Sequence, residues 1–280
     1  MIKVPFIFRF PFSYNFKRRL FFRFFYPLKD IYYPLFENVR IKSTPCVSLK
    51  LVPTDFMHGL IAFTGIYEEA LTNQIVAKAK AKAKAKAKES SLFIDVGANA
   101  GYFSIIWAFH NPFGQVYAFE ASPRNVNILE QNISQNHLHG QVRVFPIALG
   151  RESGDLPFDC GPSDLTGWGG IVNNKTDSSI SVKVESLDNL IRSNEVVDIL
   201  KIDVEGADTW VLMGAKKLLK SKRIKTIYFE QNKTRLGMLG IREDEAINFL
   251  KSVGYRVYAL SNTASDIVDW TAVPDGEEED

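Results

Sequence analysis

The stretch LFIDVGANAG, residues 92–101, constrains the fold more than any other part of this 280-residue chain. Its apolar half predicts a buried strand that ends at Val96. Gly97, Asn99 and Gly101 then allow a tight turn in which the backbone can approach a ligand closely. Apolar residues at helical spacing follow directly. Strand, glycine-containing loop and helix in this order predict a ligand site at the carboxyl end of a parallel sheet.

A second apolar strand, predicted over residues 115–120, ends on the carboxylate of Glu120. Glu120 lies 23 residues after Gly97, close to the spacing of roughly 20 at which an acid binds ribose hydroxyls in dinucleotide folds. The G-x-G-x-x-G pattern is absent, however, because an asparagine and a tyrosine occupy its second and third glycine positions. Asp95, at the end of the first strand, would repel a pyrophosphate and suits a cationic ligand. An adenosyl compound with a positively charged amino-acid end therefore fits better than NAD.

Composition excludes several classes of protein. No run of 18 uncharged apolar residues is present, so a membrane-spanning helix is not expected. Cys46 and Cys160 form neither a disulfide framework nor a metal-binding spacing, and a reducing cytoplasm is the simplest compartment. Outside residues 1–25 and the tract 77–88 the chain has 22 basic and 32 acidic residues. This acidic balance argues against nucleic acid as the partner.

The N-terminal residues 1–36 are basic and rich in aromatic side chains, and residues 1–25 hold six Lys or Arg and no acid. One interpretation is peripheral attachment of residues 1–25 to an anionic membrane, which would place the protein at the inner membrane surface. The other is an arm whose rings pack on the domain, and it is favoured because aromatic residues are mostly structural.

Residues 77–88 consist of six Ala-Lys repeats. Both residues favour helix, but alternate lysines surround such a helix and leave it no apolar face. We therefore predict a solvated helix or a disordered spacer, and we expect its deletion to leave the fold nearly intact.

Further strands are predicted along the rest of the chain. A third strand covers residues 142–146, and Ala148 begins a loop over the ligand site. Residues 151–184 are predicted to be irregular, with turns and a hairpin near residues 179–184. The remaining predicted strands cover residues 196–202, 226–229, 255–260 and 267–273.

Four of these strand tips carry acids, which are Asp95, Glu120, the pair Asp203 and Glu205, and Glu230. Because ligands of open α/β sheets bind at the carboxyl ends of the strands, these acids are predicted to converge on one site.

The sequence resembles the FkbM family of S-adenosylmethionine-dependent methyltransferases. The resemblance covers roughly residues 90–260 and rests on FIDVGANAGYFS, VYAFEASPRNVNIL, Ser186-Leu187-Asp188, KIDVEGADTWVLMGA and IYFEQ. It implies an α/β fold of the Rossmann-like class I methyltransferase type, with a doubly wound, mostly parallel seven-stranded sheet. The predicted division is an arm and lead-in over 1–66, a helix with the Ala-Lys tract over 67–89, a methyltransferase domain over 90–273 and an acidic tail over 274–280.

The resemblance also implies function, namely O-methylation of a sugar hydroxyl in a polysaccharide, glycolipid, secondary metabolite or other small molecule. Asp203 is the first choice for the general base, Glu205 is the second, and Glu230 shapes the acceptor pocket. The residues expected to bind S-adenosyl-L-methionine are Asp95, Gly97, Asn99, Gly101, Glu120 and Ala148.

Two alternatives from other classes stay open on sequence alone. They are an NAD-linked sugar oxidoreductase or epimerase, and a catalytically silent, membrane-attached binding protein of the same fold. Mg²⁺ could bridge Asp203 and Glu230, but no spacing demands it, and no metal is predicted. The sequence gives neither the acceptor nor the oligomeric state.

Overall fold

The computed structural model describes residues 8, 12–26, 35–85 and 91–276. Their main sheet has seven strands in the order β12-β13-β11-β10-β3-β4-β5, and only β13 runs against the others. This arrangement confirms the predicted mostly parallel sheet of the class I methyltransferase type. The strands are β3 Leu92–Val96, β4 Gln115–Phe119, β5 Val142–Phe145, β10 Val197–Ile202, β11 Ile224–Asn232, β12 Tyr255–Ala259 and β13 Ile267–Pro274.

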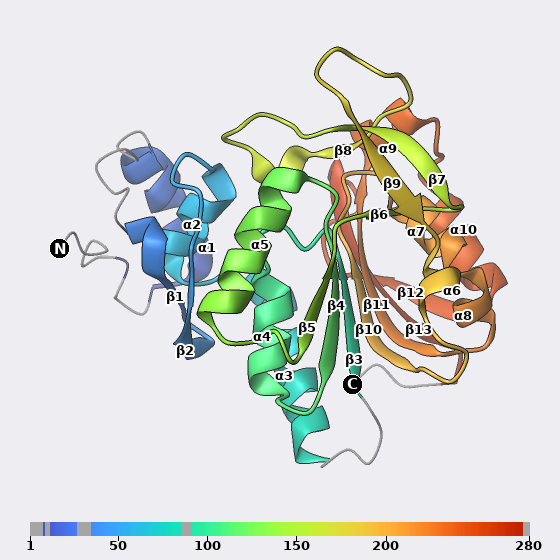
Figure 1. The fold of residues 1–280 in the computed structure, drawn as a ribbon, viewed down its shortest axis with the longest axis horizontal. Coiled ribbons are helices and arrows are strands. Elements are labelled where there is room, and N and C mark those ends of the chain that lie inside the picture. The colour runs from blue at the N-terminus through green and yellow to red at the C-terminus, as the bar shows by residue number, and fades with distance from the viewer. Residues whose placement is uncertain (1–7, 9–11, 27–34, 86–90, 277–280) are drawn as a thin grey trace.

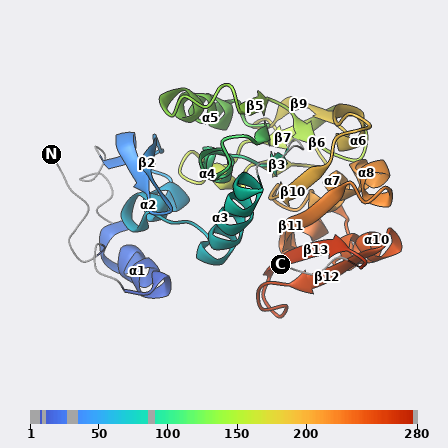
Figure 2. The ribbon, with the colours of Figure 1, turned by 90° about the horizontal axis from the view of Figure 1, so that it is seen from below.

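Helices cover both faces of this sheet (Figures 1 and 2). One face carries α3 Glu69–Lys84, α4 Tyr102–His110 and α5 Pro123–Gln135, and the other carries α6 Leu187–Leu190, α7 Asp208–Gly214, α8 Lys216–Lys220 and α10 Glu245–Ser252. Side chains of one strand alternate between the two layers. Phe93 of β3 stacks on Trp107 of α4 with ring centroids 5.3 Å apart, whereas Ile94 belongs to the core of the opposite layer.

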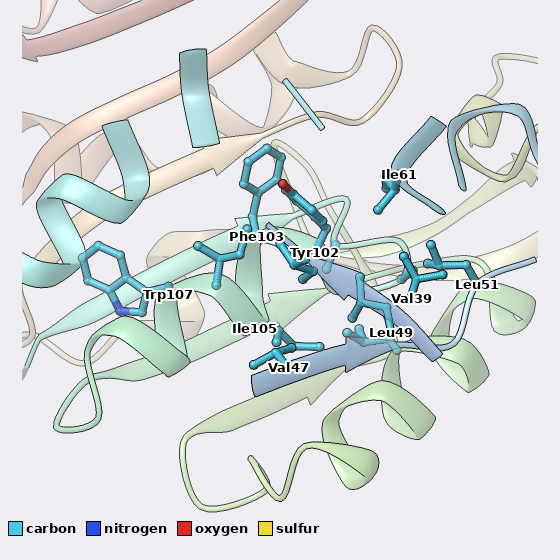
Figure 3. Close-up of a cluster of buried hydrophobic side chains, with 14 of the residues drawn as sticks. Val39, Val47, Leu49, Leu51, Ile61, Tyr102, Phe103, Ile105 and Trp107 are labelled. Carbon is cyan, nitrogen blue, oxygen red and sulfur yellow. The ribbon is translucent and has the colours of Figure 1, made fainter. Parts of the chain in front are cut away.

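The lead-in to the domain joins the same core as α4. It consists of β1 Val39–Ile41, β2 Thr44–Leu49 and α2 Phe56–Thr64, a helix that the sequence analysis missed. Val47 and Leu49 lie against Ile105 of α4 in the buried cluster drawn in Figure 3. Because this cluster also contains Phe93, the predicted boundaries near residues 66 and 89 do not separate two cores.

Several of the N-terminal rings that the structure describes pack on the lead-in, whereas Phe12, Phe16 and Phe24 are exposed. After α1 Tyr14–Leu20 and the π-helical turn Phe21–Phe25, Phe21 lies 5.0 Å from Phe63 and Phe22 stacks on Phe56 at 4.3 Å between ring centroids. These contacts support the packing interpretation. In the described part of the chain no helix is long and apolar enough to cross a membrane. Attachment of residues 1–25 to a membrane stays a prediction, and most of residues 1–11 lie outside the described ranges.

The segment predicted to be irregular forms a second, four-stranded sheet, in the order β6-β9-β7-β8. Ala148 lies in its first strand, not in a loop. The strand expected at residues 179–184 is present as β9, but it pairs with β7 and not with β8, the strand that precedes it, so it does not form a hairpin of consecutive strands. Short strands interrupted by Pro157 and several glycines conceal the alternation that identifies a strand. Helix α9, Lys233–Leu239, was also missed. The strands are β6 Ala148–Leu149, β7 Gly154–Asp159, β8 Gly170–Ile171 and β9 Ile180–Glu185.

The first part of the Ala-Lys tract is docked, contrary to the prediction of a fully solvated spacer. Helix α3 runs through it to Lys84, and Ala79 is completely buried in the core cluster beside α4. Lys82 forms an ion pair with Asp198, whose other oxygen accepts a hydrogen bond from the Leu92 backbone N–H at 3.0 Å. One small alanine is thus enough to give the Ala-Lys tract a buried contact. Residues 86–88 lie outside the described ranges.

This packing predicts that the same substitution will change the free energy of unfolding strongly at one alanine of α3 and hardly at all at a nearby one. Ala79→Asp places an unpaired charge in the core and should lower the free energy of unfolding by about 2–4 kcal/mol. Ala81→Asp, on the exposed side of the same helix, should change it by less than about 0.5 kcal/mol. Urea denaturation of both variants is the measurement, and equal stabilities would show that α3 does not dock here.

Candidate active site

The turn after β3 is fixed by a close approach of two strand ends. Gly97 has φ +78°, and a Cβ on it would collide with the carbonyl oxygen of Asp203, which follows β10. The N–H groups of Gly97 and Ala98 both donate to the Phe119 carbonyl at the tip of β4, at 2.9 and 3.0 Å. Glycine is therefore required at position 97, where the turn after β3 lies against Asp203, the first choice for the general base.

Glu120 extends from the tip of β4 into this turn. Its Oε2 accepts from the Asn99 N–H and its Oε1 from the Ser122 N–H, both at 2.8 Å. The side chain is buried, and burial raises the pKa of Glu120 while the Ser122 and Asn99 N–H groups oppose the shift. Each oxygen has accepted one hydrogen bond and retains capacity for a ligand hydroxyl.

A cavity of about 250 Å³ opens beside this turn. Four of the six residues predicted to bind the cofactor line it, and so do all three predicted catalytic residues. The former are Gly97, Asn99, Glu120 and Ala148; the latter are Asp203, Glu205 and Glu230. The acids of three strand tips therefore converge as the topology of a parallel sheet requires.

Asp95 and Gly101 do not line the cavity. Asp95 points toward α4, where its Oδ2 accepts from the Ser104 N–H and Oγ at 3.1 and 2.7 Å, and its Oδ1 lies 3.7 Å from Lys201 Nζ. Gly101 precedes α4 with φ +86°, and a Cβ on it would lie 2.6 Å from Leu129 Cδ1. Both residues support the turn through contacts with the helices behind it, and neither belongs to the wall of this cavity.

The segment between β7 and β8 covers the cavity with Thr166 and Trp168. Asp55 ties this cover to the lead-in, because its Oδ2 accepts from the Thr166 N–H at 2.6 Å and its Oδ1 from the His58 N–H at 2.8 Å. Asn125 of α5 donates to the Thr166 carbonyl at 3.0 Å. The cover is therefore anchored at two elements far apart in sequence.

Sequence reasoning missed His58, Asn125 and Thr166, all of which line the cavity. Only Asn125 carried a usable signal. It stands four residues before Leu129 on the buried side of α5, where a polar residue must find partners. Among the described residues its Oδ1 is a buried acceptor without a hydrogen-bond partner.

Lys201 is the central cation of the site. It is 4% exposed and donates to Asp203 Oδ2 at 3.1 Å, while the ring of Phe103 lies 5.1 Å from its Nζ. Burial alone would lower the pKa of Lys201, but the carboxylates of Asp203, Asp95 and Glu68 hold it above its ordinary value. A charged lysine therefore fixes the orientation of Asp203, whose side chain is 27% exposed.

Glu205 is held away from Lys201 by its own partners. Its Oε2 lies 3.7 Å from Arg235 Nε and 3.4 Å from Asn232 Nδ2. Glu205 and Gly206 both have positive φ, and a Cβ on Gly206 would lie 2.7 Å from Arg235 Cβ. Burial and the charge of Asp203 raise the pKa of Glu205 to about 7, with Arg235 opposing the shift.

Two further acids, Asp208 and Glu230, complete the cluster. Asp208 Oδ1 accepts from the Glu230 N–H at 3.4 Å. Burial raises the pKa of Asp208 to about 7, and the charge of Asp203 adds to the shift. Burial, Asp203 and Asp208 likewise raise the pKa of Glu230 well above its usual range. Protonated carboxyls can then donate hydrogen bonds in a site where several negative charges would repel one another.

In the ranges that the structure describes, no group of three or more His, Cys, Asp or Glu side chains is arranged to hold a metal ion. The cavity wall offers hydrogen-bond acceptors on Glu120 and on the Asn125 Oδ1, and Asp203 supplies a negative charge.

Comparison with known proteins agrees with the class defined by this sheet and cavity. Residues 95–257 match the model of the methyltransferase FkbM domain, so the chain belongs to the FkbM methyltransferase family. The cofactor of this class is S-adenosylmethionine, as expected above.

Two curated relatives are similar over part of their length. The chain is 31% identical over 135 residues to the hexuronic acid methyltransferase AglP of Haloferax volcanii, covering 48% of this chain and 53% of that protein. It is 27% identical over 158 residues to the 2-O-methyltransferase NoeI of Sinorhizobium fredii, covering 50% and 64%. The chain thus spans between about half and two thirds of these relatives.

Among solved structures, the FkbM methyltransferase from Methylobacillus flagellatus aligns with a TM-score of 0.46 at 13% identity. The alignment covers 88% of this chain and 58% of that one.

The buried carboxyl of Asp208 predicts a pH dependence of stability. Because its pKa is about 7 in the folded protein and about 4 when unfolded, the folded state keeps a proton that the unfolded state releases as pH rises between these values. Its contribution to stability is therefore present at low pH and is lost as pH approaches 7. Asp208→Asn should lose less stability between pH 5 and 8 than the unchanged protein does, by about 1–3 kcal/mol.

Urea denaturation across this pH range is the measurement. Asp177→Asn, at an exposed loop position, is the matched control and should follow the unchanged protein. Parallel curves for Asp208→Asn and the unchanged protein would contradict the assigned protonation.

Proposed function

We propose that this protein transfers the methyl group of S-adenosylmethionine to a hydroxyl of a sugar or a similar small hydroxyl compound. The observation that carries the proposal is the position of Asp203. Its carboxylate lies at the carboxyl end of β10, fixed by Lys201, in the wall of the cavity that contains the family's turn and Glu120. The names of the two relatives, a hexuronic acid methyltransferase and a 2-O-methyltransferase, support a sugar acceptor.

Binding of the cofactor is assigned to the cavity beside the turn after β3. Glu120 would accept the ribose hydroxyls, Asn125 would accept a further hydrogen bond, and the backbone of Gly97 and Asn99 would lie against the ligand. S-adenosylmethionine supplies an electrophilic methyl group, so that a carbon–oxygen bond forms at the acceptor as the carbon–sulfur bond breaks.

The chain's own part in the reaction is positioning and proton transfer. Asp203 takes the proton that the acceptor hydroxyl loses, and Lys201 keeps the carboxylate oriented. Glu205 is less suited to this step because Arg235 and Asn232 already engage it. Glu230, protonated at neutral pH, can donate a hydrogen bond that orients the acceptor.

We expect Glu120→Ala to weaken binding of S-adenosylmethionine by about 1–3 kcal/mol, because the substitution strands hydrogen-bond partners of a buried carboxylate. Isothermal titration calorimetry measures the effect. Glu130→Ala, on the exposed side of α5, should leave affinity unchanged. Equal affinities for the two folded variants would mean that the ribose is held elsewhere.

The role of Asp203 is tested by Asp203→Asn. Turnover to S-adenosylhomocysteine should fall by about 10²–10⁴, the usual contribution of a positioned base, while cofactor affinity stays within a few-fold. Glu205→Gln should cost less. If both acids only anchor the loop at Gly206, the two substitutions will lower the melting temperature and leave the single-turnover rate near normal.

The same assay separates the competing hypotheses. A protein that binds S-adenosylmethionine tightly and never forms S-adenosylhomocysteine with any hydroxyl acceptor would be the catalytically silent alternative. Binding of NAD in preference to S-adenosylmethionine would instead support an oxidoreductase.

A further inference from the structure

A second cavity, of about 560 Å³, is lined by Asp203 but by no residue of the turn after β3. Its walls come from α1, from the beginning of α3, from the end of β11 and from β13. Lys201, Asp203 and Glu230 line both cavities. A compound in the second cavity would therefore contact the proposed base without contacting the turn after β3.

The walls of this cavity combine flat aromatic rings with hydrogen-bonding groups. Tyr14, Tyr228 and Trp270 supply rings, while Asn15, Asn73 and Gln74 supply amides. Within the described ranges the Trp270 Nε1 is a buried donor without a hydrogen-bond partner. Rings for the apolar faces and amides for the hydroxyls match the chemistry of a sugar, and the volume lies within the range of small-molecule sites.

The charge of the cavity is one-sided. Five acidic side chains line it, and Lys201, the cation among the described residues of its wall, is already shared between Asp95 and Asp203. The five are Glu68, Glu69, Asp203, Glu230 and Asp269. Burial and the charge of Asp203 raise the pKa of Glu68 to about 7, and they raise the pKa of Asp269 as well. The cavity therefore disfavours each additional negative charge.

We propose that this second cavity holds the methyl acceptor and that the acceptor is a sugar without an anionic group, either neutral or amino-bearing. The inference rests on the proposed function and narrows its substrate. A uronate would bring a carboxylate next to Glu68 and Asp269, and the described part of the cavity wall offers it no cation besides Lys201. A protonated amine would instead find acceptors on several sides. The acceptor class therefore differs from the hexuronic acid in the name of one relative.

Three glycosides that share one type of sugar ring test which charge the cavity prefers. Methyl glucoside is neutral, methyl glucosaminide carries an amine, and methyl glucuronide carries a carboxylate. Binding to the full chain saturated with S-adenosylhomocysteine is measured by saturation-transfer NMR at low ionic strength. We expect the glucuronide to bind at least about tenfold more weakly than the glucosaminide, since like charges brought together cost several kcal/mol.

Two substitutions in the cavity wall should shift this selectivity. Asp269→Asn removes a negative charge at the exposed rim and should reduce the preference for the glucosaminide. Asn73→Lys, on the exposed side of α3, adds an ammonium and should raise the affinity for the glucuronide. Asp177→Asn, which makes the same charge change as Asp269→Asn at a remote loop, should change neither.

The outcomes are distinguishable from those that concern the proposed function. If S-adenosylhomocysteine binds but the glucuronide is preferred, or none of the three probes binds, the inference is overturned and the methyltransferase proposal stands. If the probes discriminate as expected while S-adenosylhomocysteine does not bind, the charge selectivity of the cavity stands, but its assignment to a methyl acceptor fails together with the proposed function. Equal effects of Asp269→Asn and Asp177→Asn would place any sugar binding outside this cavity.

Discussion

The buried ion pairs of Lys201 hold the functional end of the sheet together. Lys201 faces Asp95 in the register of β10 and β3, and it donates to Asp203 just beyond the strand. Asp95 in turn accepts from Ser104 at the beginning of α4. One ammonium thus connects two strands and, through Asp95, the following helix. Removing it would leave uncompensated carboxylates in the interior, a more costly state than the pair itself.

The cation partners of the acids also determine which of these carboxyls keep a proton. Asp203 has the lysine, Glu205 has Arg235, and Glu230 has neither in an ion pair that the structure records. Carboxyls that lack a nearby cation keep their protons more readily. The neighbouring acids therefore differ in protonation because their partners differ, and a proton acceptor can lie beside a hydrogen-bond donor.

The sequence was sufficient for the sheet because β3, β4 and β10 are mostly apolar runs that are followed by glycine or an acid, a pattern with few structural alternatives. It was insufficient for residues 148–185, where strands as short as β6 and β8 carry two residues each and no periodicity can show. The convergence of Glu120, Asp203 and Glu230 followed from topology. The placement of His58 and Thr166 did not, because hydrogen bonds between distant segments leave no local pattern. Ala79 was misjudged because the burial of one methyl group is decided by its neighbour α4.

The two hydrogen bonds of Asp55 have a consequence for how the protein tolerates change. They join the start of α2 to the cover at Thr166, so the roof of the cofactor cavity rests on a segment that precedes the methyltransferase domain in sequence. A deletion that removes Asp55 would therefore release the segment at Thr166, and it would also remove part of the core that the lead-in shares with α4. Extra residues inserted near Asn173 or Lys175, in the exposed β8–β9 connection, would leave that roof in place. Variation in chain length thus has unequal effects on the two sides of the same cavity.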